Sequence, residues 1–296
     1  MNAVALLIGL GPLLGWGLFP TVASKIGGKP SHQILGATAG TFIFAVIFAW
    51  VQGIPMPSGS ALVFSIISGI GWACAQIVTF MSFGLVGSSR AMPVTTAFQL
   101  LGASLWGAFY LGDWPGVTNK VIGILALVAI IIGAYMTVWS ENKTAEKSGN
   151  LKKAVLWLAI GEIGYWAYSA APQAAHIDGM HAFLPQSIGM LIVGIVYGII
   201  MTFNKNTDEK PLKDSTSYKQ IIAGFFFAFG ALTYLISAQP DMNGLATGFV
   251  LSQTSVILAT LTGIWFLGQK KTKKEMTITV IGLIIIVIAA AVTEFI

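Results

Sequence analysis

Ten long apolar stretches follow one another along this chain, and no other feature limits its possible folds as strongly. Each contains about 19–25 residues, enough for an α-helix to cross the roughly 30 Å hydrocarbon core of a bilayer. Because lipid offers no hydrogen-bond partners, stretches of this length must satisfy their own backbone groups as helices. The sequence therefore predicts an all-α integral membrane protein with ten transmembrane helices. They cover approximately residues 2–24, 32–51, 60–83, 90–111, 117–139, 154–174, 183–203, 219–238, 244–268 and 276–295.

The basic residues fall almost entirely in alternate connections between these stretches. Fifteen of the 16 Lys and Arg residues lie in or beside the odd-numbered connections, and only Lys120 lies beside an even-numbered one. Short loops rich in Lys and Arg stay in the cytoplasm, so we expect both termini outside. Orientation and attraction to lipid headgroups explain the net charge of +5, and we expect no nucleic-acid partner.

Composition excludes several classes of function. Charged residues are 9% of the chain, against about a quarter in a typical soluble domain. No connection exceeds about 15 residues, and none contains a G-x-x-x-x-G-K-[ST] loop, so we expect no ATP-binding domain. We expect a gradient to be the driving force instead. The single cysteine, Cys74, excludes an intrachain disulfide. Paired carboxylates, metal-spaced His/Cys sets and Ser-His-Asp arrangements are not visible, so we expect no enzyme activity, metal or cofactor.

The chain shows signs of an internal duplication. A shift of 152 residues places Pro20 on Pro172, and a later shift of 156 places Gly107 on Gly263. A nearly constant offset indicates two five-helix halves with a few residues inserted between them. We expect a first repeat at 1–140, a cytoplasmic connection at 141–153 and a second repeat at 154–296.

Five helices per repeat is an odd number, so the second repeat must enter the membrane from the opposite side. The charges of equivalent connections support this inversion: the first carries Lys25 and Lys29, whereas its equivalent, the sixth, carries Asp178 and no lysine. Inverted repeats recur in secondary transporters, where one half rocks against the other to give alternating access. Channels also use them, so the architecture indicates transport without fixing the mechanism.

Glu162 is the one acidic residue placed deep in an apolar stretch. It follows Lys153 by nine residues, which places it about 13 Å along a helix from the predicted cytoplasmic end. A carboxylate near the bilayer midplane is costly and is retained where it faces a cavity or a partner, which suits a proton carrier. The alternative is a permanently protonated Glu162 that makes one interhelical hydrogen bond.

Glutamine and tryptophan recur together on several predicted helix faces. A sugar site needs amide or hydroxyl groups for the sugar hydroxyls and flat rings for the apolar C–H faces. The alternative for any single Gln is a helix–helix hydrogen bond worth about 0.6–2 kcal/mol in membranes. Taken together with Glu162, these side chains favour a binding site. The candidate substrate-binding residues are Trp16, Trp72, Gln76, Gln99, Trp166 and Gln253.

Two stretches, residues 71–76 and 87–100, resemble the glucose/ribose porter family, a branch of the drug/metabolite transporter superfamily. Residues 9–17, 160–166 and 237–248 are more similar to its ribose-uptake members from Gram-positive bacteria than to its glucose-uptake members. The resemblance covers essentially the whole chain. It implies ten helices in two halves, and sugar import with protons through a central cavity lined by helices of both halves.

These observations lead to three functional hypotheses. The first is a proton-coupled importer of ribose, or of glucose, in the plasma membrane of a Gram-positive bacterium, with Glu162 as the proton carrier. The second is an exporter of metabolites or drugs from the same superfamily, because Glu162 with Trp166 would also suit a cationic drug. The third is a membrane sensor that transports nothing. The oligomeric state is left open.

Overall fold

The computed structural model describes residues 3–112, 114–141, 148–239 and 241–296, and every regular element in these ranges is a helix. The helices form ten rods that correspond to the ten apolar stretches, and four of the rods are divided into two elements. The rods are α1 (Ala3–Gly9) with α2 (Gly11–Ile26), α3 (Pro30–Gln52), α4 (Gly59–Val86), α5 (Ser88–Trp106) with the π-helical η1 (Gly107–Leu111), α6 (Gly116–Val138), α7 (Ser148–Ala174), α8 (Gly179–Phe203), α9 (Ser215–Lys219) with α10 (Ile221–Ser237), α11 (Gly244–Gln253) with α12 (Ser255–Phe266), and α13 (Lys273–Phe295).

Eight of the rods are long and apolar enough to cross a membrane. This confirms the predicted all-helical, multi-pass membrane protein. The other two rods, α5 with η1 and α7, carry more polar residues and pack against each other. Polar side chains on these two helices can therefore face protein instead of lipid.

Local sequence signals define several helix ends. Gly87, with a φ of 81°, ends α4 and directly precedes α5, a left-handed conformation that glycine adopts without strain. Asp178 caps α8 by accepting hydrogen bonds from the backbone N–H groups of Met180 and His181. A reciprocal capping box joins Thr272 and Glu275 at the start of α13. The rods begin and end at residues that suit those positions.

Paired glycines let several rods approach closely. A Cβ atom added to Gly71 of α4 would collide with the backbone of Gly164 in α7, and the reverse also holds. Gly133 of α6 and Gly282 of α13 are related in the same way. Because there is little hydrophobic drive between helices in lipid, close backbone packing at small residues contributes much of their association.

The rods of the two predicted repeats contact each other in matching ways. α4, in the first predicted repeat, packs on α7 and α8 of the second, and α10, in the second predicted repeat, packs on α2 and α3 of the first. Likewise α5 contacts α7, and α12 contacts α2. The boundaries at 1–140, 141–153 and 154–296, the inversion of the second repeat and the outside location of both termini stay predictions. Residues 142–147 of the predicted connection lie outside the described ranges.

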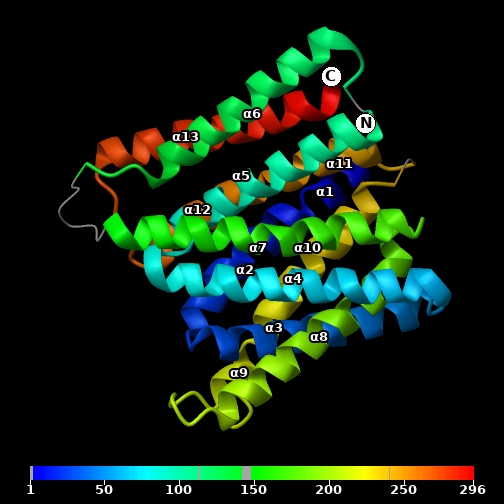
Figure 1. Ribbon diagram of the computed structural model, residues 1–296, viewed down its shortest axis with the longest axis vertical. Helices are drawn as coiled ribbons and strands as arrows, with labels where there is room; N and C mark the ends of the chain where they lie inside the picture. The colour runs from blue at the N-terminus through cyan, green and yellow to red at the C-terminus, as the bar shows by residue number, and fades with distance from the viewer. Residues whose placement is uncertain (1–2, 113, 142–147, 240) are drawn as a thin grey trace.

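Both chain ends lie at the right of the view in Figure 1. The segments that join α8 to α9 and α12 to α13 lie at the left. These two segments carry Lys205, Lys210, Lys213, Lys270 and Lys271. We call this end of the bundle, opposite the termini, the lysine-bearing end. The main buried core lies between α2, α3, α4, α7, α8 and α10, and a second lies between α5, α6 and α13.

Candidate functional site

Glu162 lies in the interior of the bundle. It is on α7, which packs against α4 and α5, and its relative exposure is 1%. Neither carboxylate oxygen has a hydrogen-bond partner among the residues that the structure describes. An ionised carboxylate without a partner would be costly at this position. Over the described residues, the interhelical hydrogen bond of the alternative interpretation is not formed.

A polar network lies one helical turn from Glu162. Tyr165, three residues further along α7, donates its hydroxyl to Gln76 Oε1 on α4 at 2.7 Å. The Tyr165 and Thr79 hydroxyl oxygens are 3.0 Å apart. Gln76 is 5% exposed and Thr79 is buried. The amide of Gln76 therefore joins two helices, as expected for a polar residue between transmembrane spans.

Trp72 lies one turn before Gln76 on α4 and belongs to a cluster of aromatic rings. Its relative exposure is 3%, and its ring centroid is 4.2 Å from that of Phe227 on α10. Trp16 of α2 stacks near the same ring, with centroids 6.4 Å apart and planes inclined by 24°. The indole N–H of Trp16 donates to the Phe227 carbonyl oxygen at 3.2 Å. Phe227 therefore links the two predicted tryptophans.

The aromatic cluster extends further than the predicted residues. Phe19 lies 6.5 Å from Trp72 and 5.6 Å from Phe227, measured between ring centroids. Tyr234 lies 5.7 Å from Trp16. In this conformation the predicted stacking surfaces of Trp16 and Trp72 are packed against protein rings. Sequence reasoning missed Phe227 because a lone Phe in an apolar stretch gives no signal of its distant partners.

Gln99 and Gln253 form hydrogen bonds within their own rods. Gln99 Nε2 on α5 donates to Thr95 Oγ1 at 3.5 Å, and Gln253 Nε2 donates to Ser252 Oγ at 3.2 Å. Gln253 is the last residue of α11, at the break between α11 and α12. Broken transmembrane helices commonly border binding sites in transporters, because their free backbone groups are available to ligands.

Trp166 lies at the contact between α7 and α5 and is 43% exposed. Its indole ring lies directly against Gly102 of α5, where a Cβ atom would overlap it. The structure thus brings together Trp16, Trp72, Gln76 and the segment of α7 that holds Glu162. Trp166 is also on α7, but it lies at the contact of α7 with Gly102 of α5. The hydrogen bonds of Gln99 and Gln253 described above are to Thr95 and Ser252, outside this group.

Among the described residues, no group of three or more His, Cys, Asp or Glu side chains could hold a metal ion. Cys74 is a free, exposed thiol. The interior of the bundle offers amide, hydroxyl, carboxyl and aromatic groups, which is the chemistry expected for a small polar ligand with some apolar surface.

The fold and its interior define a multi-pass helical membrane protein with polar and aromatic side chains buried between spans. A sequence model of the family described as “Sugar transport protein” matches residues 7–296. The chain belongs to this family of sugar transporters and is not an enzyme. This confirms the resemblance found in the sequence.

Several curated proteins are similar over their full length. The chain is 70% identical over 296 residues to “Putative ribose uptake protein RbsU” of Enterococcus faecalis, covering 100% of both. It is 70% identical over 293 residues to a protein of the same name from Lactobacillus johnsonii, covering 99% of both. A solved crystal structure shares the fold, with a TM-score of 0.66 and 16% sequence identity over 100% of this chain and 99% of that one.

Proposed function

We propose that this protein imports ribose across the plasma membrane by proton symport, and that the Glu162 carboxyl group carries the proton. Membership of the sugar transporter family and the names of the full-length relatives support the cargo. The observation that carries the coupling mechanism is the Glu162 side chain, which is buried with both oxygens unpartnered within the described part of the chain.

Glu162 suits a proton carrier because its surroundings favour different protonation states at different stages of transport. In a closed, dry interior the neutral acid is less costly than the carboxylate. When the cavity opens to water, hydration stabilises the carboxylate and the proton can leave. Alternating access would then expose Glu162 to each side of the membrane in turn. The matching contacts of the two halves support such a motion.

The sugar would bind beside Glu162, on α4 and α7. Gln76 offers both an acceptor and donors, Tyr165 offers a hydroxyl, and Trp72 offers a ring for the apolar face of the sugar. Trp16 is linked to Trp72 through Phe227, so displacement of the Phe227 ring would expose both indoles. Gln99, Trp166 and Gln253 complete the proposed lining from the neighbouring rods.

The substitution Glu162→Gln tests the coupling mechanism. The amide cannot exchange a proton, so we expect ribose accumulation driven by a pH gradient in proteoliposomes to fall to a ratio of about one. Exchange of labelled for unlabelled ribose at equal pH should continue, because it needs no net proton movement. Asp208→Asn removes an exposed acid in the segment joining α8 to α9, and it should accumulate ribose like the wild type.

The same proteoliposomes test the cargo. Unlabelled ribose should inhibit uptake more strongly than glucose, and an excess of a lipophilic cation should leave it unchanged. Accumulation that survives in Glu162→Gln would contradict the carrier role. Stronger inhibition by the cation would favour the drug exporter, and an absence of flux with any sugar would favour the sensor.

A further inference from the structure

Pro172 interrupts the backbone hydrogen bonds of α7, the helix that carries Glu162 and Tyr165. Proline has no backbone N–H, so it cannot donate to the carbonyl oxygen four residues earlier, which belongs to Tyr168. Pro172 is buried and lies inside the helix, near its end. In lipid, a carbonyl group freed in this way needs a donor from a side chain or a neighbouring helix.

Ser68 of α4 supplies this donor. Its hydroxyl donates to the Tyr168 carbonyl oxygen at 2.7 Å, and Gln186 Nε2 of α8 donates to Ser68 Oγ at 2.9 Å. The Gln186 amide occupies a lone pair of the Ser68 oxygen, so the hydroxyl hydrogen is directed to Tyr168. Ser68 is 0% exposed and Gln186 is 5% exposed, so both donors are shielded from water. These three groups, which we call the Ser68 joint, connect α4, α7 and α8.

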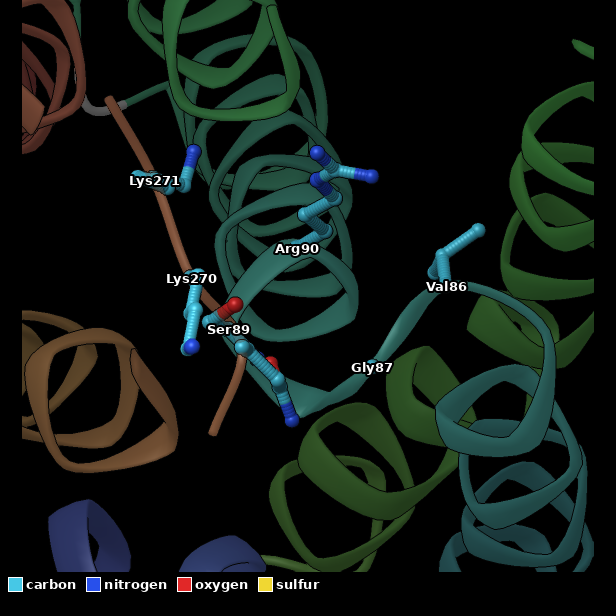
Figure 2. A pocket seen from close by; sticks show the side chains of 7 residues that line it. Val86, Gly87, Ser89, Arg90, Lys270 and Lys271 are labelled. Atoms are coloured by element: carbon cyan, nitrogen blue, oxygen red, sulfur yellow. The ribbon is translucent and has the colours of Figure 1, made fainter. Parts of the chain in front are cut away.

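The helices are closely packed at the Ser68 joint. A Cβ atom on Gly69 of α4 would collide with the Gln186 carbonyl group, and one on Gly189 of α8 would collide with the backbone of α4. The pocket of about 220 Å³ shown in Figure 2 lies at the other, lysine-bearing end of α4, and none of its lining residues belongs to the joint. The joint is therefore a packed contact between helices and not part of that pocket.

The Ser68 joint attaches the same two helices as the bond between Tyr165 and Gln76. On α4, Ser68, Trp72 and Gln76 follow one another at intervals of four residues and share a face. On α7, Tyr165 and Tyr168 are three residues apart. The joint thus fixes the position of α7 along α4 about one helical turn from Tyr165. A shift of α7 at the joint would move the Tyr165 hydroxyl away from Gln76 Oε1, which it contacts at 2.7 Å.

We propose that Ser68 and Gln186 are positioning residues of the transport site. Ser68 supplies the hydrogen bond that Pro172 removes, and Gln186 orients the Ser68 hydroxyl. Together they hold α7 where Tyr165 can bond Gln76. Neither residue contacts the sugar. This inference rests on the proposed function, which assigns Tyr165 and Gln76 to sugar binding.

Substitution of the proline tests the role of Ser68, because it restores the missing donor at another position. Ser68→Ala removes the hydroxyl that bonds Tyr168. In Ser68→Ala/Pro172→Ala, the new backbone N–H of residue 172 can donate to the same carbonyl oxygen. The matched control is Ser68→Ala/Pro20→Ala, since Pro20 is also buried inside a helix, but on α2, which does not belong to the joint. The single proline variants complete the two cycles.

The KM and maximal rate for ribose are measured from initial uptake rates in proteoliposomes. Ser68→Ala should raise KM by about fivefold, because a buried acceptor without a partner costs about this factor or more in an equilibrium constant. The maximal rate should stay within about twofold, since the proton carrier is unchanged. In the Pro172→Ala background the effect of Ser68→Ala on KM should fall to about twofold or less, and in the Pro20→Ala background it should stay at about fivefold.

The unfolding temperature in detergent, measured without sugar, should follow the same pattern. Ser68→Ala should lower it by about 2 °C or more, and Pro172→Ala should remove most of this loss. A small loss should remain, because the Gln186 amide has lost its acceptor. If Ser68→Ala does not fold, Gln186→Leu takes its place with the same proline variants. It should raise KM by a smaller factor, since the Ser68 hydroxyl is then present but no longer oriented.

An unchanged KM with a lowered unfolding temperature would overturn the positioning role and leave Ser68 a structural residue. Equal rescue by Pro20→Ala and Pro172→Ala would overturn it as well. If the wild type moves no sugar, the proposed function fails, and the inference is tested without sugar by combining Ser68→Ala with Tyr165→Phe. Tyr165→Phe should then lower the unfolding temperature less in the Ser68→Ala background than in the wild type. Equal losses in the two backgrounds would overturn the inference.

Discussion

The Tyr165 hydroxyl connects the two helices that the proposed transport mechanism uses. It bonds Gln76 on α4, and it is three residues from Glu162 on α7. A sugar hydroxyl that binds Gln76 must compete with this bond or extend it. Tyr165 therefore belongs to the proposed site, although it is not among the candidate residues taken from the sequence.

We expect Tyr165→Phe to impair sugar binding while the protein stays folded. The loss of the hydroxyl leaves Gln76 Oε1 without this buried partner, which typically costs about 1–3 kcal/mol. The KM for ribose, from initial uptake rates in proteoliposomes, should therefore rise by about tenfold or more. Tyr135→Phe removes an exposed hydroxyl on α6 and should leave KM unchanged. A KM within twofold of the wild type in both variants would remove Tyr165 from the site.

Helical periodicity predicted part of this site. Trp72 and Gln76 are four residues apart on α4, and Glu162 and Tyr165 are three apart on α7, so each pair shares a face. Periodicity does not show which helices pack together. The contacts of Trp72 and Trp16 with Phe227, and of Trp166 with Gly102, depend on packing between distant segments, and sequence patterns did not reveal them.

The pair formed by α6 and α13 shows how small residues bring whole rods together. Gly133 and Gly282 meet backbone to backbone, and the Lys271 ammonium group joins the ends of both rods. Gly84 of α4 is helical as well, but open space surrounds its Cβ position. The same substitution should therefore have opposite effects at the two glycines.

Gly133→Ala should destabilise the protein by about 1–2 kcal/mol, because the overpacking cost exceeds the gain in helix propensity. Gly84→Ala should leave stability unchanged or raise it by up to about 1 kcal/mol, since only the propensity gain applies. The free energy of unfolding is measured from reversible denaturation in mixed micelles. A loss of stability in Gly84→Ala equal to that in Gly133→Ala would contradict the close contact of α6 with α13.

For the whole molecule, the apolar stretches predicted the ten helical rods, whereas the orientation inferred from the spacing of the lysines stays a prediction. Ten stretches became ten helical rods, because each backbone polar group in lipid needs an internal partner. The stretches did not indicate that four rods would divide into two elements. The break after Gln253 falls in a run without proline, so the usual helix-breaking signal is missing.

The predicted topology is tested by labelling single cysteines in whole cells with a maleimide that cannot cross membranes. In a Cys74→Ser background, Ser58→Cys lies in the segment joining α3 to α4, and Asn206→Cys lies in the segment joining α8 to α9. Ser58→Cys should react in intact cells, whereas Asn206→Cys should react only after the cells are made permeable. Equal reaction of both in intact cells would contradict the predicted orientation.

The contact between α5 and α7 has a consequence for biosynthesis. A nascent helix leaves the translocon for the bilayer according to its own transfer free energy, and a central residue such as Glu162 opposes that step. α7 packs on α4 and α5, which the ribosome has already delivered when α7 emerges. We therefore expect α7, the first span of the predicted second repeat, to enter lipid beside the helices that shield its carboxyl group in the folded protein. Because α4 and α5 are synthesised before α7, the helices that surround Glu162 are in place before the chain is complete.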